Sequence, residues 1–252
     1  MSAAEARAGL PSRALLAAIL AAWAVLLAVE ATPGDRYLSH QYEPSSVAGQ
    51  SVAVALYLVG WLLMSVAMML PTAGRLLGDF DAVVARRGDH RRLTVLLVGG
   101  FLATWLATGY LFRTGDVFVH LAVDASTWLQ HHTALIGGGT IVVAGLYQLS
   151  DLKHRCLTAC RTPRGFVFRH WRGGRPGHDA FRIGLAYGVS CVGCCWALML
   201  MMFGLGTMSP WWMLALTAVM AAEKNLAIGP RLVQPLGVAL IALGLVVAVA
   251  PT

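Results

Sequence analysis

Residues 182–204 read RIGLAYGVSCVGCCWALMLMMFG, and after Arg182 this stretch contains no charged side chain. An α-helix needs about 20 predominantly apolar residues to cross the hydrocarbon core of a bilayer, which is about 30 Å thick. The stretch is long and apolar enough, so we predict that it forms a membrane-spanning helix. Three of the five cysteines of the chain lie in it, so the helix that decides the fold class also carries most of the thiols.

The composition of the whole chain agrees with a membrane protein. Of the 252 residues, 58% are hydrophobic and 12% are charged, whereas soluble domains carry about 25% charged residues. The mean hydropathy is +0.67. A soluble globule of this size has too little interior to hide so much apolar surface. The composition therefore excludes a cytosolic enzyme, and it equally excludes a disordered or fibrous chain.

Further apolar stretches of similar length lie on both sides of the first. We predict an all-α, polytopic membrane helix bundle in which residues 1–252 form a single domain with about seven transmembrane helices. The expected helices cover about 14–31, 51–72, 92–113, 133–150, 182–204, 208–228 and 232–250.

The basic residues lie almost entirely on one side of this predicted arrangement. Seventeen of the nineteen Lys and Arg residues fall in the N-terminal segment or in every second connection, and only Arg36 and Arg113 fall in the others. Since cytoplasmic loops carry the excess of Lys and Arg, we predict a cytoplasmic N-terminus and an external C-terminus. The external loops would be 32–50 and 114–132. The most basic segment is the predicted cytoplasmic loop 151–181, for which we expect contact with anionic membrane lipids and no binding of nucleic acid.

The three cysteines of the quoted stretch are Cys191, Cys194 and Cys195. On a helix Cys191 and Cys195 share a face, and Cys191 lies roughly 14 Å along the axis from Arg182, near the predicted bilayer midplane. Thiolates are soft ligands that favour Cu(I) and also bind Zn(II). Three thiols within five residues therefore predict a metal site in the membrane, with inert packing of small apolar side chains as the alternative.

Methionines continue the same pattern of soft side chains. Met199 and Met202 follow Cys191 and Cys195 along the helix, and Met64 and Met68 share one face of the predicted helix 51–72. Thioethers are further ligands for Cu(I), so we predict auxiliary or relay roles for these four residues. Methionines at helical spacing are also common in ordinary packing, which remains the alternative.

The other two cysteines, Cys156 and Cys160, lie just past the predicted helix 133–150. One helical turn separates them, so their sulfurs can approach each other, and nearby Lys153 and Arg155 favour the thiolate form. A structural disulfide is uncommon in a reducing cytoplasm. We therefore predict metal exchange or thiol exchange at the cytoplasmic face.

Glu223 and Lys224 lie in the predicted helix 208–228, toward its cytoplasmic end. Ionisable residues inside a membrane segment are costly and usually serve a function. We count Glu223 among the candidate metal-site residues. The alternative is an interfacial pair whose charged ends reach the headgroup region.

Six motifs occur together in this chain. They are Met64 to Pro71, Leu152-Lys153 with Cys156, Cys160-Arg161-x-Pro163, Gly188 through Cys191-Val192-Gly193-Cys194-Cys195-Trp196 to Met199, Gly206-x-Met208 with Trp212-Met213, and Glu223-Lys224. This combination resembles the bacterial predicted metal-binding integral membrane protein family, domain of unknown function 2182, over about residues 51–225. The resemblance implies an all-helical protein of the bacterial inner membrane with a metal site, and it implies no particular activity.

The leading hypothesis is a multi-pass membrane protein that binds or moves a soft metal ion, most readily Cu(I), with zinc as the second choice. A metal-donor or metal-acceptor protein would be its partner. The sequence contains no phosphate-binding loop, no paired carboxylates and no nucleophile elbow, which favours a binding protein over an enzyme. Two alternatives stay open, a membrane thiol-disulfide redox protein and a structural or assembly subunit of a membrane complex.

Overall fold

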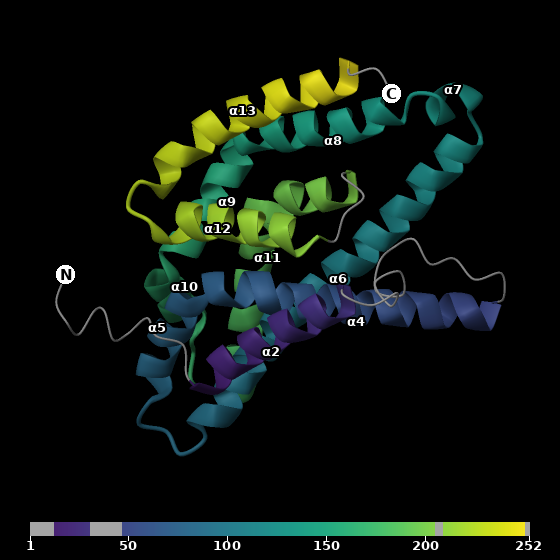
Figure 1. The fold of residues 1–252 in the computed structure, drawn as a ribbon. Helices are drawn as coiled ribbons and strands as arrows, with labels where there is room; N and C mark the ends of the chain where they lie inside the picture. Colours follow the sequence, from purple (N-terminus) through teal and green to yellow (C-terminus); the bar gives the residue numbers. More distant parts are fainter. Residues whose placement is uncertain (1–12, 31–46, 205–208, 250–252) are drawn as a thin grey trace.

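The computed structural model describes residues 13–30, 47–204 and 209–249, and every regular element in these ranges is a helix (Figure 1). The all-α class is therefore confirmed. The helices are α2 (Arg13–Glu30), α4 (Val47–Thr72), α5 (Gly74–Val84), α6 (His90–Asp124), α7 (Thr127–Gln130), α8 (Thr133–Gln148), α9 (Asp151–Arg161), α10 (Pro163–His170), α11 (Pro176–Gly204), α12 (Pro210–Asn225) and α13 (Gly229–Val249).

Five of these helices are long and apolar enough to cross a membrane, namely α2, α4, α6, α11 and α13. Helices α8 and α9 together pass the same test, but they are bent by 65° at the break between them. Helix α12 has 16 residues. Each of the seven predicted stretches coincides with a helix, whereas a count of seven membrane spans and the orientation of the termini stay predictions.

Three predicted connections contain helices that the hydropathy pattern did not indicate. Helix α6 continues to Asp124 and takes in the first half of the predicted loop 114–132, because no proline interrupts the chain there. The predicted loop 151–181 contains α9 and α10, and the connection after α4 contains α5. Polar residues interrupt these segments too often for them to be found as apolar runs, although they form helices.

Local sequence explains where the helices of the centre begin and end. Pro71 lies in the last turn of α4, which ends at Thr72, as expected of a proline, which disrupts a continuing helix. After α8, the side chain of Ser150 accepts a hydrogen bond from the backbone N–H of Lys153 and so caps α9. Asp151 in the first turn and Arg161 in the last turn of α9 complement the helix dipole.

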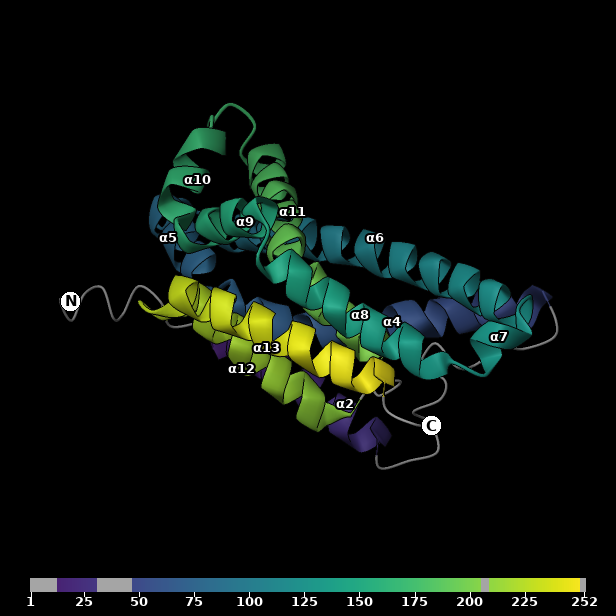
Figure 2. The same ribbon diagram turned by 90° about the horizontal axis from the view of Figure 1, so that it is seen from above.

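Two pairs of helices pack backbone against backbone through glycine. Helices α8 and α13 lie side by side (Figures 1 and 2), and a Cβ added to Gly138 would lie 2.6 Å from the carbonyl oxygen of Gly244. Helices α6 and α11 meet at Gly100 and Gly184 in the same way. Small residues allow such close approach, which is a common way for helices to associate in membranes.

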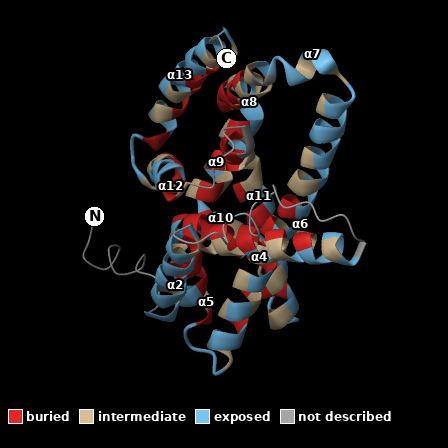
Figure 3. Ribbon diagram, turned by 45° about the vertical axis from the view of Figure 1, so that its right-hand side comes forward, coloured by how far each residue is buried: buried red, intermediate tan, exposed pale blue. Residues whose placement is uncertain are grey.

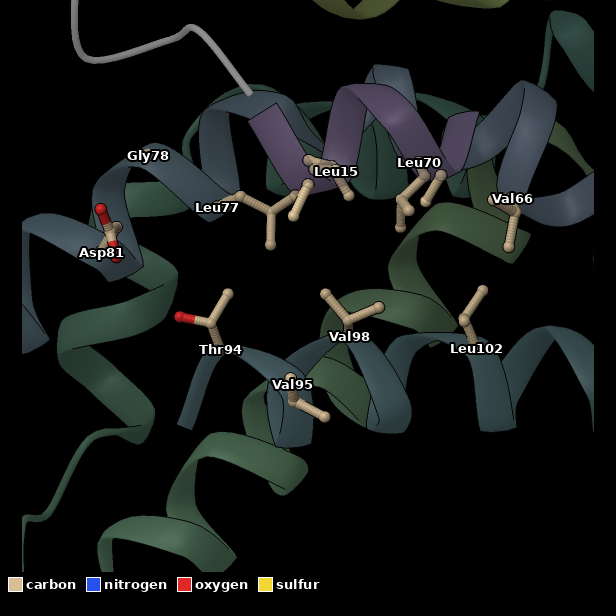
Figure 4. Close-up of a pocket in the computed structure, with 12 residues that line it drawn as sticks. Leu15, Val66, Leu70, Leu77, Gly78, Asp81, Thr94, Val95, Val98 and Leu102 are labelled. Atoms are coloured by element: carbon tan, nitrogen blue, oxygen red, sulfur yellow. The ribbon is translucent and has the colours of Figure 1, made fainter. Parts of the chain in front are cut away.

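The buried residues gather in the middle of the molecule, where α4, α9 and α11 meet, while the end of α6 next to α7 is largely exposed (Figure 3). Apart from this centre, a cavity of about 360 Å³ opens between α2, α4, α5 and α6. Its walls are mostly aliphatic, with Leu15, Leu70 and Val98 among them and Asp81 toward one end (Figure 4). Because no cysteine or methionine lies among the described lining residues, the cavity is separate from the thiols.

Candidate metal centre

The break between α8 and α9 turns one cysteine of the second pair, Cys160, into the core. Cys160, on α9, is 3% exposed, and its Sγ lies 3.8 Å from the Sγ of Cys194 on α11. The hydroxyl of Tyr187 donates a hydrogen bond to the carbonyl oxygen of Cys160 at 3.0 Å and fixes this end of α9 against α11. The two cysteine groups, which the sequence placed at different depths, therefore form one cluster.

The three cysteines of α11 are all buried and face the same centre. The thiols of Cys194 and Cys195 donate hydrogen bonds to the carbonyl oxygen of Cys191, at 3.1 and 2.8 Å. The Sγ of Cys195 also lies 3.9 Å from the Sδ of Met69 on α4. Helices α4, α9 and α11 thus contribute five buried sulfur-bearing residues to one region, and we name Cys160, Cys191, Cys194, Cys195 and Met69 the thiol cluster.

Cys156 lies one turn before Cys160 and is the only half-exposed cysteine of the chain. A Cβ added to Gly193 would lie 2.5 Å from its Sγ, so the absence of a side chain at Gly193 makes the room for this thiol. Cys156 therefore lies between the surface and the thiol cluster, on the helix that carries Cys160.

A lysine contacts the thiol cluster directly. The ammonium of Lys224, on α12, lies 3.1 Å from the Sγ of Cys191 and 3.1 Å from the hydroxyl oxygen of Thr72. Lys224 is 3% exposed. The hydroxyl of Thr72 donates its own hydrogen to the carbonyl oxygen of Met69 at 2.8 Å, so its oxygen is free to accept from the lysine.

The neighbouring Glu223 has different partners. One carboxylate oxygen pairs with the ammonium of Lys153 at 2.6 Å, and the other accepts a hydrogen bond from the side-chain amide of Gln148 at 2.9 Å. The side chains of Lys153 and Glu223 are 1% and 2% exposed. Glu223 and Lys224 thus do not pair with each other at a membrane interface. Both are buried, and they face separate partners.

Arg161 holds the end of α12 in place. Its guanidinium donates hydrogen bonds to the backbone carbonyl oxygens of Glu223, Lys224 and Leu226, at 2.6, 3.2 and 2.8 Å. These carbonyls at the helix terminus have no partner within the helix. Helix α9 therefore contacts α12 through Arg161 and Lys153, and it contacts α11 through Cys160. Together these contacts fix the position of Lys224 relative to the thiols.

The spacing of the sulfurs suits a shared ion. Two thiolates on one tetrahedral ion, with metal–sulfur bonds of about 2.3 Å, lie about 3.8 Å apart, and the Cys160–Cys194 distance is 3.8 Å. Within the part of the chain that the structure describes, no three His, Cys, Asp or Glu side chains are already arranged around one metal position. The thiol cluster thus has suitable donor atoms and one suitable pair, without a complete ligand set.

The predicted site residues are distributed unevenly around the thiol cluster. Four predicted cysteines belong to it and the fifth, Cys156, lies beside it, while the four predicted methionines, Met64, Met68, Met199 and Met202, are all buried in the surrounding core. The methionine whose sulfur contacts a thiol is Met69, the neighbour of the predicted Met68. Sequence reasoning missed Thr72, and it considered Lys224 only together with Glu223. Both residues could have been found as polar residues at the ends of apolar helices.

The chain matches a known protein family. The family described as PpoB2, copper chaperone, matches residues 58–247, which contain the entire thiol cluster. The match covers most of the 252 residues, and the chain belongs to this family. It is a copper-related family, as the predicted soft-metal site suggested, but it is not the family named from the motifs. No curated protein and no solved structure shows a significant match to the chain.

Proposed function

We propose that this protein is a multi-pass protein of the bacterial inner membrane that binds Cu(I) in the thiol cluster and passes it to an acceptor protein. The observation that carries the proposal is the approach of Cys160 on α9 to Cys194 on α11, at 3.8 Å inside the core. Buried thiols and a thioether select Cu(I) over harder ions. Membership in a copper chaperone family supports the same ion.

Orientation follows from the distribution of basic residues. With about seven spans, the excess of Lys and Arg on one side favours a cytoplasmic N-terminus and an external C-terminus. Helix α9, which carries Cys156 and Cys160, then starts from the cytoplasmic side. Cys156 is half-exposed there, so in this proposal it receives or releases the ion, while Cys160 and Cys194 hold it.

The methionines contribute weaker ligands in this proposal. Met69 supplies a thioether next to Cys195, and Met64, Met68, Met199 and Met202 provide relay positions in the surrounding core. Glu223 has both carboxylate oxygens engaged by Lys153 and Gln148. Its contribution is to hold α12 next to α9, and a direct role toward the metal would require it to leave these partners.

The test is copper loading of the purified protein in detergent under reducing conditions. We expect about one Cu(I) per chain by elemental analysis, and loss of this copper in Cys160→Ser and in the combined variant Cys191→Ser/Cys194→Ser/Cys195→Ser. Serine is close to cysteine in size, so the thermal unfolding of the variants should change little. Its hydroxyl is a hard ligand and does not replace a thiolate for Cu(I). Copper that stays bound to both variants would contradict the proposal.

A second function is favoured by the same contact. Two thiols 3.8 Å apart need only a small movement to form a disulfide, whose sulfurs lie about 2.05 Å apart. A free-thiol count on the same samples separates the two functions. A protein that binds no copper, and that loses two thiols reversibly when it is oxidised, would be a thiol-disulfide redox protein.

A further inference from the structure

Lys224 is a buried positive charge with no acidic partner among the described residues. Its ammonium contacts the Sγ of Cys191 and the hydroxyl oxygen of Thr72, each at 3.1 Å. Lys153, the other buried lysine, differs in this respect, since it pairs with the carboxylate of Glu223 at 2.6 Å. One buried lysine thus has a carboxylate partner, while the other, Lys224, has a thiol and a hydroxyl.

The charges of this region do not cancel without the sulfurs. Among the buried side chains, Lys153 and Glu223 compensate each other and Thr72 is neutral, so one positive charge remains on Lys224; Arg161, which holds the end of α12, is only partly buried. An isolated buried charge costs several kcal/mol unless an opposite charge lies close by. The groups of the thiol cluster that become negative when a metal binds are the thiols that take up the ion, because metal ligands bind as thiolates, and Lys224 touches this cluster at Cys191.

We propose that Lys224 is the built-in counter-charge of a copper–thiolate complex and makes the thiol cluster selective for a monovalent ion. This inference rests on the proposed function. When one Cu(I) binds two of the cluster's thiols, two protons leave to solvent and one positive charge enters. The complex then carries one negative charge, and the ammonium of Lys224 brings the buried site to neutrality.

With a divalent ion, the charges of the buried site do not cancel. Zn(II) on the same two thiolates forms a neutral complex, which leaves the ammonium of Lys224 uncompensated next to a divalent cation. The repulsion acts over a distance of a few ångströms in a buried environment, where charges interact strongly. Lys224 therefore favours Cu(I) over Zn(II) at a pair of thiolates that by their softness accept either ion.

The test compares Lys224→Met with Lys224→Arg in the full-length protein. Methionine removes the charge and nearly keeps the length of the side chain, while arginine keeps the charge. An uncompensated buried charge is costly, and Lys224→Met removes it, so we expect this variant to fold, as judged by thermal unfolding. Affinities for Cu(I) and for Zn(II) are measured separately, by competition with a chromophoric chelator for each ion.

For Lys224→Met we expect Cu(I) affinity to fall about tenfold or more and Zn(II) affinity to rise, while Lys224→Arg keeps the preference for Cu(I). The control is Thr72→Val, which removes the neutral partner of the ammonium and should change both affinities by a similar factor. An unchanged ratio of the two affinities in a folded Lys224→Met protein would overturn the inference and leave the proposed function intact. Wild-type protein that binds no Cu(I) would overturn both.

Discussion

The interface between α8 and α13 and the junction of α9, α11 and α12 are built in opposite ways. The first is a glycine seam in which Gly138 faces Gly244 and Gly145 faces Gly237, and it holds two apolar helices together by close contact. The second buries two lysines, a glutamate and four thiols. Both are interior regions of one helical bundle, but only the second contains polar and charged groups, each of which needs a partner when it is buried.

The difference separates a region whose packing suits stability from a region whose charges suit a function. Close packing through glycine is a common means of helix association in membranes. A buried ion pair, in contrast, often adds no stability over apolar residues of similar size, because the loss of hydration offsets the attraction. The charges around Lys153, Glu223 and Lys224 are therefore better explained by the thiols that they position than by the stability of the fold.

The largest effect on stability is expected when the buried ion pair loses one partner. Glu223→Leu leaves the ammonium of Lys153 buried without its carboxylate, so we expect thermal or denaturant unfolding in detergent to show a loss of about 3–5 kcal/mol. The double variant Lys153→Met/Glu223→Leu is the matched control and should recover most of this loss. A single variant as stable as the wild type would mean that the pair is hydrated in solution.

The glycine seam should respond to a single methyl group. In Gly138→Ala the new Cβ meets the backbone of α13, and such overpacking costs about 1–3 kcal/mol. Copper bound per folded chain should not change, because the seam is outside the thiol cluster. Gly139→Ala is the control, since its Cβ would have no neighbour within 4 Å. Equal stability of the two variants, compared by thermal unfolding, would contradict the described contact.

The smallest effect on stability is expected at the half-exposed thiol. Cys156→Ser should change the unfolding free energy by less than about 1 kcal/mol and should leave the amount of bound copper unchanged. Removal of copper by a water-soluble chelator should become slower, because a thiol between the surface and the thiol cluster is missing. Removal at the wild-type rate would show that the ion takes another path.

The sequence predicts the helical class and most helix positions well, because an uninterrupted apolar run of about 20 residues is typical of a membrane-spanning helix and of little else. The course of α9 was not predictable in this way. Ser150 caps that helix after a sharp bend, and a search for apolar runs interprets the polar segment that follows as a loop. This one bend moves Cys160 from an expected surface position to the side of Cys194.

The cysteines of the candidate site were predictable from the sequence, whereas most of their contacts were not. Cys191, Cys194 and Cys195 stand out by their spacing alone, and the structure places all three in the buried centre. The choice of Met69 over Met68 as the neighbour of Cys195 depends on the rotation of α4, and the contact of Lys224 with Cys191 depends on how α12 is held by α9. Such long-range contacts leave no trace in local spacing.

X-ray absorption at the copper edge of the loaded protein tests most directly whether α9 and α11 bind one copper ion together. We predict an all-sulfur first shell around Cu(I) in the wild type. In Cys160→Ser, and equally in Cys194→Ser, copper should be lost or its shell should have one sulfur fewer. Wild-type copper content and an unchanged sulfur shell in both variants would contradict shared binding by the two helices.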